Sequence, residues 1–261
     1  MTAFLGKSSF VGPPVAVGTT KGSFVSQARF NGCIAASNWA RGDVERLLPP
    51  ELALAANVSS TPDRHPVLFV FGDLSDGAVI AGGRVIPLGI AYQEFALAIP
   101  FVRHRRGNHL HTYVPRMYSS YLPAVWSGNV NYGLAKRSAT MRWQGPFFVL
   151  TTDAGSLVLH IAVETQQDWS RASSCPLPEF GAMREIFSMP VVGRKGSGAY
   201  VCSYFGWDFE DALLRLVDSS ISIDGPVVEN LLPRRCPDVP GGTFEVRGMI
   251  WRLSWPSRCR F

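Results

Sequence analysis

The chain of 261 residues lacks several features that would place it in a large protein class at once. No run of about 18 or more apolar residues occurs, so we expect no membrane-spanning helix. The N-terminal residues show no basic start followed by a sustained apolar run, which argues against a secretory signal. The five cysteines lie far apart without a CxxC pair, so we expect free thiols in the cytoplasm rather than a zinc site or disulfide framework.

Charge is also scarce, and familiar nucleotide motifs are missing. Only 17% of the residues are charged and 46% are hydrophobic, which is typical of a core-forming chain and not of a disordered one. The net charge of +5 is dispersed, and neither a nucleic-acid motif nor a Gly-rich phosphate loop accompanies it. We therefore expect no nucleic-acid partner, while a mildly positive field favours a small anionic substrate.

What the sequence does contain is turns and short apolar runs. The 25 glycines and 19 prolines are scattered, and no repeat or linker is visible, so we predict a single domain over residues 1–261 with an extended N-terminal arm over 1–22. A short helix is predicted at 38–48, and weaker helical periodicity follows at 118–126 and 180–187. The remaining segments predict strands, with a hairpin turn at 153–156. These strands are predicted at 24–36, 67–71, 91–100, 111–114, 147–152, 157–163, 200–204, 210–217 and 244–253.

This succession of short strands without a βαβ rhythm predicts a mainly β (α+β) fold with a few short helices. We expect the strands to form an antiparallel β-barrel that is closed or nearly closed, because closure removes exposed sheet edges.

One segment carries a chemical signal, at residues 128–137. Lys136 and Arg137 end a run of small, apolar and uncharged residues. Loss of hydration disfavours the ammonium form of a lysine, and a neighbouring cation acts in the same direction. The free amine is the form that attacks a carbonyl to give a Schiff base. Taken alone, the pair also fits the solvent-facing end of a strand.

The segment resembles the active-site region of the acetoacetate decarboxylase family, in which a glycine precedes a Lys-Lys pair. Gly128 matches this glycine, Lys136 the first lysine and Arg137 the second, while Ala135 replaces the usual proline. The resemblance implies that Lys136 forms the Schiff base and that Arg137 opposes protonation of its amine. It also implies the barrel fold of that family and a homo-oligomer.

Further matches lie upstream, so the resemblance covers residues 24–165. Residues 113–118 resemble the stretch that leads to the glycine, which implies substrate binding by Tyr113 and Met117. Residues 92–100 resemble the Tyr-x-Glu segment, which implies that Glu94 lines the catalytic pocket.

Arg29 falls, within one position, where the family has an arginine that meets the substrate carboxylate, although it also fits an ordinary strand arginine. A second family glutamate has no counterpart in the strand at 67–71, and residues 73–85 resemble a Gly-rich insertion.

Two alternatives concern single residues. Glu94 also fits a surface acid, but its apolar neighbours indicate a buried carboxylate that needs a partner such as Lys136. His109 and His111 lie on one side of a predicted strand, yet no further ligand completes a metal site. We therefore expect neither a metal nor a cofactor.

The sequence leaves three functions open. The leading hypothesis is a cofactor-free carbon–carbon lyase that decarboxylates a small β-oxo acid through a Lys136 iminium, with Glu94 transferring protons. The same iminium serves an aldolase-dehydratase acting on an oxo acid, which is the first alternative. The second alternative is a non-catalytic barrel that binds a small molecule.

Overall fold

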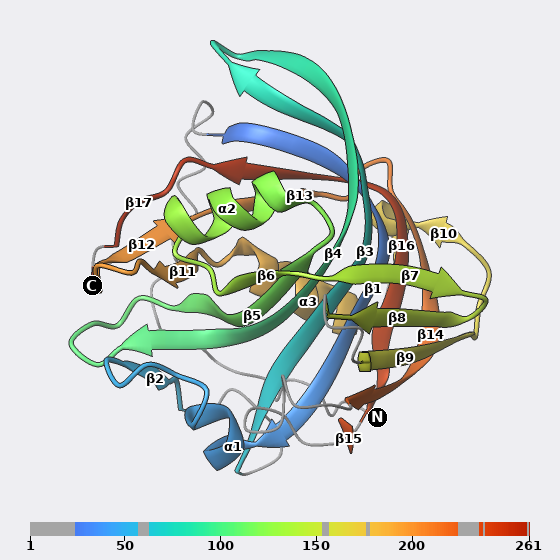
Figure 1. Cartoon of the computed structure of the whole chain (residues 1–261). Helices are drawn as coiled ribbons and strands as arrows, with labels where there is room; N and C mark the ends of the chain where they lie inside the picture. Colours follow the sequence, from blue (N-terminus) through green and yellow to red (C-terminus); the bar gives the residue numbers. More distant parts are fainter. Residues whose placement is uncertain are drawn as a thin grey trace.

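The computed structural model describes residues 24–56, 63–152, 157–175, 178–223, 235–236, 238–259 and 261. The N-terminal arm expected over residues 1–22 and the turn expected at 153–156 lie outside the described residues. Within them, long curved strands dominate and few helices occur (Figure 1), so the mainly β prediction is confirmed.

The centre of the fold consists of four long strands. They are β1 (Phe24–Ala40), β3 (Arg64–Ala81), β4 (Arg84–His104) and β16 (Asp238–Ser254). Strand β1 pairs with β16 on one side and with β3 on the other, and β3 continues into β4; all three pairings are antiparallel.

Both faces of this central sheet are covered. In β3, Val67, Phe69 and Phe71 are fully buried in one apolar core, whereas Leu68 and Val70 contact the cores on the opposite face. Because successive residues point to opposite faces, burial on both sides gives the continuous apolar run at 67–71 that the sequence shows.

The prediction of an antiparallel barrel that is closed or nearly closed is wrong in two respects, because the sheet is mixed and does not close within the described residues. Strand β5 (His111–Ser119) pairs antiparallel with β4 but parallel with β6 (Lys136–Ser138) and β11 (Val191–Arg194). Helix α2 (Leu122–Val130) lies between β5 and β6 in the chain and crosses over the sheet edge. This crossover returns β6 beside β5 in the same direction, which a hairpin cannot do.

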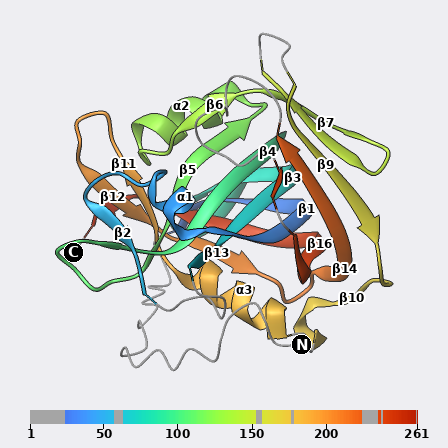
Figure 2. The same ribbon diagram turned by 90° about the horizontal axis from the view of Figure 1, so that it is seen from below.

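The other elements are shorter. They are β2 (Leu52–Leu54), β7 (Thr140–Gln144), β8 (Phe147–Thr151), β9 (Leu157–Thr165), β10 (Ser170–Arg171), the 3₁₀ helix η1 (Ala172–Ser174), α3 (Pro178–Ser188), β12 (Tyr200–Ser203), β13 (Phe205–Asp208), β14 (Leu213–Ile223), β15 (Arg235–Cys236) and β17 (Ser257–Arg258). Helix α3 packs on β13 and β16 and lies beneath the sheet in Figure 2. None of the helices in the described part of the chain has the length and apolar character needed to cross a membrane.

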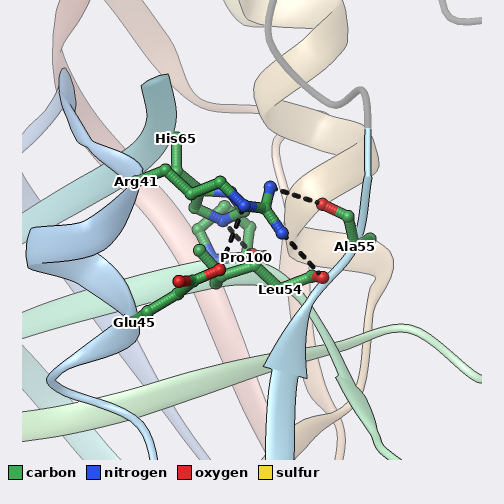
Figure 3. A network of polar contacts seen from close by, with 6 residues as sticks. All are labelled: Arg41, Glu45, Leu54, Ala55, His65 and Pro100. Carbon is green, nitrogen blue, oxygen red and sulfur yellow. Dashed lines mark hydrogen bonds and ion pairs between the residues drawn. The ribbon is translucent and has the colours of Figure 1, made fainter. Parts of the chain in front are cut away.

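The helix predicted at 38–48 is only α1 (Arg41–Glu45) in the structure. Residues 38–40 extend β1 instead, because they pair with β3. The Arg41 guanidinium donates hydrogen bonds of 3.0 Å to the carbonyls of Leu54 and Ala55 and pairs with Glu45 (Figure 3). These contacts fix the short helix beside β2.

The expectation of free thiols is wrong for two cysteines. Cys202 and Cys259 form a disulfide across 57 positions of sequence. Pairing of β12 with β17 brings them together, and this long-range contact has no local sequence signal. Cys33 and Cys175 are free, and Cys33 is buried.

The distal end of the β3–β4 hairpin projects from the sheet (Figure 1). It includes most of the segment that resembles an insertion. Its apolar side chains are exposed by 39 to 51%, and they are Val79, Val85, Ile86 and Leu88.

Candidate active site

Lys136 is held at the start of β6 by a side chain from α2. Its backbone N–H donates a 3.0 Å hydrogen bond to Asn129 Oδ1, and its carbonyl accepts one of 2.8 Å from Asn129 Nδ2. Strand β6 begins in register with Met117 of β5. The amide therefore fixes the position from which the lysine side chain extends. Asn129 lies within the segment at 128–137, but no local pattern in the sequence indicates its contact with Lys136.

Gly128 lets the helix approach this lysine closely. A Cβ at position 128 would lie 2.8 Å from Lys136 Cδ, nearer than real Cβ contacts allow. The lysine stem thus occupies the space that a side chain at position 128 would need. This close approach is a physical reason for the glycine in the motif.

The amine of Lys136 forms an ion pair with the Glu94 carboxylate. Only 7% of the lysine side chain and 14% of the glutamate side chain are exposed. Glu94 lies on β4 opposite Ser119 of β5, while Lys136 lies on β6 at the other side of β5. A buried charge is strongly disfavoured without a partner, so each group makes the burial of the other tolerable. The pair is also arranged for direct proton transfer.

A cavity of about 80 Å³ adjoins this pair. That is several times the roughly 10–15 Å³ that one water molecule requires, so a small organic molecule fits. Glu94 lines the cavity, and its ion pair connects the cavity wall to the amine of Lys136. The remaining wall is mostly apolar and includes Met117 and five aromatic residues: Phe30, Phe187, Phe205, Trp207 and Trp251.

Arg137 lies on the other side of β6 and is exposed. Successive residues of a strand point to opposite faces, so adjacent positions receive different surroundings. Burial lowers the pKa of Arg116 on β5, and the positive charge of Arg137 lowers it further. Arg137 thus acts electrostatically on a second arginine.

Two of the predicted substrate-binding residues lie away from the cavity. Arg29 is exposed and donates a 3.0 Å hydrogen bond to Asp76, whereas its neighbour Phe30 lines the cavity. Tyr113 packs against the core on the far face of β5, and burial raises its pKa. Of the substrate-binding set, only Met117 lines the cavity.

The described residues contain no group of three or more His, Cys, Asp or Glu side chains that could hold a metal ion. His111 is buried, and this burial lowers its pKa. His109 is exposed, so the two histidines of the HxH pair do not share one environment.

The fold belongs to a recognisable class of enzyme structures. No family model and no curated protein matches the sequence. Solved structures of acetoacetate decarboxylase and of similar enzymes nevertheless align with 90 to 97% of this chain. The resemblance read from the sequence is therefore confirmed in the fold.

Three particular structures illustrate the likeness. Acetoacetate decarboxylase from Legionella pneumophila subsp. pneumophila str. Philadelphia 1 has a TM-score of 0.61 and 13% identity, and the match covers 90% of this chain and 87% of that one. An acetoacetate decarboxylase-like enzyme from Sphingomonas wittichii RW1 has a TM-score of 0.60 and 11% identity, and the match covers 91% of this chain and 93% of that one. The third structure is the enduracididine biosynthesis enzyme MppR complexed with the condensation product of pyruvate and imidazole 4-carboxaldehyde. It has a TM-score of 0.61 and 13% identity, and the match covers 97% of this chain and 92% of that one.

Proposed function

We propose that this chain is a Schiff-base-forming enzyme that makes or breaks a carbon–carbon bond, with Lys136 as the nucleophile and Glu94 as the proton-transfer group. The observation that carries the proposal is the buried Lys136–Glu94 ion pair beside an apolar cavity. The fold shared with acetoacetate decarboxylase supports it. No cofactor enters this chemistry, because the iminium itself accepts electrons.

The first step is transfer of a proton from the Lys136 ammonium to Glu94, which leaves a neutral amine and a carboxylic acid. The amine nitrogen attacks the substrate carbonyl carbon, and proton transfer to oxygen gives a carbinolamine. Glu94 then protonates the hydroxyl group, water leaves, and a protonated iminium remains beside the Glu94 carboxylate. The charges at the end equal those at the start, which suits a site with little water.

Decarboxylation of a small β-oxo acid is one reaction open to this iminium. The bond to the carboxylate breaks, its electron pair forms an enamine, and CO₂ leaves. A proton then adds to the enamine carbon, and hydrolysis of the resulting iminium releases a ketone and regenerates Lys136. This reaction requires that the cavity first accept a carboxylate.

An aldol condensation with loss of water is the second candidate, and the location of Arg29 favours it. The guanidinium expected to hold a substrate carboxylate pairs with Asp76 on an exposed face instead. An enamine at Lys136 can add to an aldehyde without any carboxylate. The condensation product named for the MppR structure, formed from pyruvate and an aldehyde, is consistent with carbonyl condensation in a similar fold, although pyruvate itself carries a carboxylate.

Borohydride trapping read by intact mass tests the proposal. A carbonyl that forms an imine with Lys136 gives a stable adduct after reduction, and peptide mapping locates it. Lys136→Arg is the sharpest variant, because arginine keeps a cation beside Glu94 yet stays protonated and forms no imine. Lys195→Arg is the matched control, because the ion pair with Glu94 is made by Lys136. Absence of an adduct with every carbonyl would favour the non-catalytic barrel.

Self-association and a cytoplasmic location stay predictions of the sequence. Sedimentation of the full chain tests the first of these.

A further inference from the structure

The cavity contains little that can bind an anion. Glu94 is the one charged residue among the described residues that line it, and no Lys, Arg or His side chain joins the lining. The nearest cation, Lys136, is already paired with Glu94. Arg29 lies on another face, paired with Asp76. A substrate carboxylate in this cavity would meet a like charge and no free cation.

The charges present during the reaction also disfavour an anionic substrate. A Lys136 iminium carries one positive charge, and the Glu94 carboxylate carries one negative charge. An uncharged substrate leaves this pair balanced, whereas a substrate carboxylate adds an unpaired negative charge inside an apolar wall. Burial of an unpaired carboxylate is strongly disfavoured, so the site selects against anionic carbonyl compounds.

The wall favours an apolar, flat substrate. Phe187 stacks on Trp207 at 4.4 Å between ring centroids, and Phe205 lies between Trp207 and Trp251 at 6.4 and 5.9 Å. These rings come from α3, β13 and β16 and form one continuous aromatic surface. Such a surface gains most from contact with another apolar or aromatic group.

Besides Glu94 Oε1, which forms the ion pair with Lys136, two polar atoms of the lining residues have no hydrogen-bond partner among the residues that the structure describes. They are Trp251 Nε1 and Thr112 Oγ1, and both atoms are buried. Buried donors in folded proteins are nearly always paired. An indole N–H donates only, so its partner must be an acceptor. A neutral oxygen supplies that acceptor without adding charge.

We infer that the substrate is an uncharged aldehyde or ketone with a small apolar body and a second, neutral acceptor oxygen that Trp251 Nε1 binds. The inference rests on the Schiff base of the proposed function, and it favours the aldol reaction over decarboxylation of an oxo acid. Trp251 is thereby a substrate-binding residue for the end of the molecule away from the reacting carbonyl.

Matched carbonyl pairs separate charge from shape. Phenylacetone and phenylpyruvate differ by a methyl group in place of a carboxylate. The concentration that gives half-maximal borohydride trapping on the full chain is measured for each, divided by its value on Nα-acetyl-lysine to remove intrinsic reactivity. We expect the normalised half-maximal concentration of phenylacetone to be at least about tenfold lower than that of phenylpyruvate, because phenylacetone buries no charge.

A second pair tests Trp251. Methyl acetoacetate carries a neutral acceptor that hexan-2-one of similar length lacks. In Trp251→Phe, the ratio of half-maximal concentrations, ester over ketone, should rise about fivefold, the effect of one neutral hydrogen bond. Trp255→Phe is the matched control: this residue is 60% exposed and does not line the cavity, so the ratio should stay constant.

The outcomes distinguish the two claims. Tighter or equal trapping of phenylpyruvate overturns the inference while leaving the Schiff base intact. An unchanged ester-to-ketone ratio in Trp251→Phe overturns the role of Trp251. Failure of every carbonyl to form an adduct at Lys136 overturns the proposed function itself.

Discussion

Lys136 and Arg137 are adjacent cations, yet the two sides of β6 give them opposite surroundings. On one side the Lys136 amine is buried against Glu94, beside a mostly apolar cavity. On the other side Arg137 is exposed and acts on Arg116, another cation. The chain thus separates a buried, paired charge from a solvated one within two residues.

The difference shows what makes a lysine available for chemistry. Screening by water weakens the interactions of an exposed cation, so Arg137 can change little around it. The buried amine of Lys136 instead has the Glu94 carboxylate as its ion-pair partner. We therefore expect the proposed reaction to need the acid on β4 as much as the lysine on β6.

Replacement of Lys136 tests the comparison most strongly. Lys136→Arg should reduce trapping of every carbonyl below detection, because no other side chain supplies the imine nitrogen at this site. Arg137→Met should retain adduct formation within about threefold, since its side chain lies on the other face. Intact mass after borohydride treatment checks both. Equal losses in the two variants would contradict the separation of the faces.

Removal of the acid should destabilise the fold. Glu94→Gln leaves a buried ammonium without its counter-charge, which costs about 3 kcal/mol in the free energy of unfolding, somewhat less if the amide oxygen still accepts a hydrogen bond. Asp76→Asn breaks the exposed pair with Arg29 and should cost below about 1 kcal/mol. Urea unfolding compares them. Similar losses would show that burial does not distinguish the two pairs.

His65 shows what burial does to a base that has no acid beside it. Burial lowers its pKa to about 4, and its Nε2–H donates to the Pro100 carbonyl at 2.9 Å (Figure 3). The unfolded chain binds this proton near pH 6.5, so the contribution to stability is complete above that pH and is lost as pH falls towards 4. The loss is at most about 3 kcal/mol.

A His65→Gln variant checks this pH dependence. Its urea midpoint should fall less steeply between pH 6.5 and 4 than that of the original chain, because one proton-linked group is gone. An unchanged slope would assign the acid sensitivity to other groups, of which buried His111 is the first to test.

Local sequence patterns predicted some of this structure well. The apolar run at 67–71 reflects burial on both faces of a strand, which composition records directly. The uncharged run before Lys136 covers the end of α2 and the turn that leads into β6. Crossover connections, long-range strand pairs and disulfides have no such local pattern in the sequence. The parallel β5–β6 pair depends on how α2 returns the chain, and the Cys202–Cys259 disulfide depends on the pairing of β12 with β17.

The residues of the candidate site likewise include some that local motifs predicted and others that they did not. The structure brings Lys136, Glu94 and Met117 together, and the motif resemblance predicted all three. Arg29 failed to join them because strand alternation turns it outward, and a motif match within one position cannot fix that direction. The aromatic wall was not predicted, since all of its residues except Phe30 come from segments of the C-terminal half for which no resemblance was recognised.

A smaller effect is expected at the glycine that contacts the lysine stem. Gly128→Ala places a Cβ 2.8 Å from Lys136 Cδ, so the lysine must shift, at about 1–3 kcal/mol in stability and with slower adduct formation. Gly42→Ala is the matched control, because a Cβ there meets nothing within 4 Å. That variant should be neutral or stabilising by up to about 1 kcal/mol. Normal trapping in Gly128→Ala would show that the lysine has room to move.

The smallest effect should come from Arg137→Gln. The sequence motif suggests that this cation opposes protonation of Lys136, whereas the structure places it in water on the other face of β6. An exposed charge acts through a high dielectric and is screened by salt, so its loss should change the rate of adduct formation at neutral pH less than about threefold. The rate is measured for both proteins at low and at high salt. A residual electrostatic effect should shrink as salt is added, because screening removes it. A loss of tenfold or more that persists in high salt would instead place Arg137 within the catalytic machinery and remove the contrast between the two sides of β6.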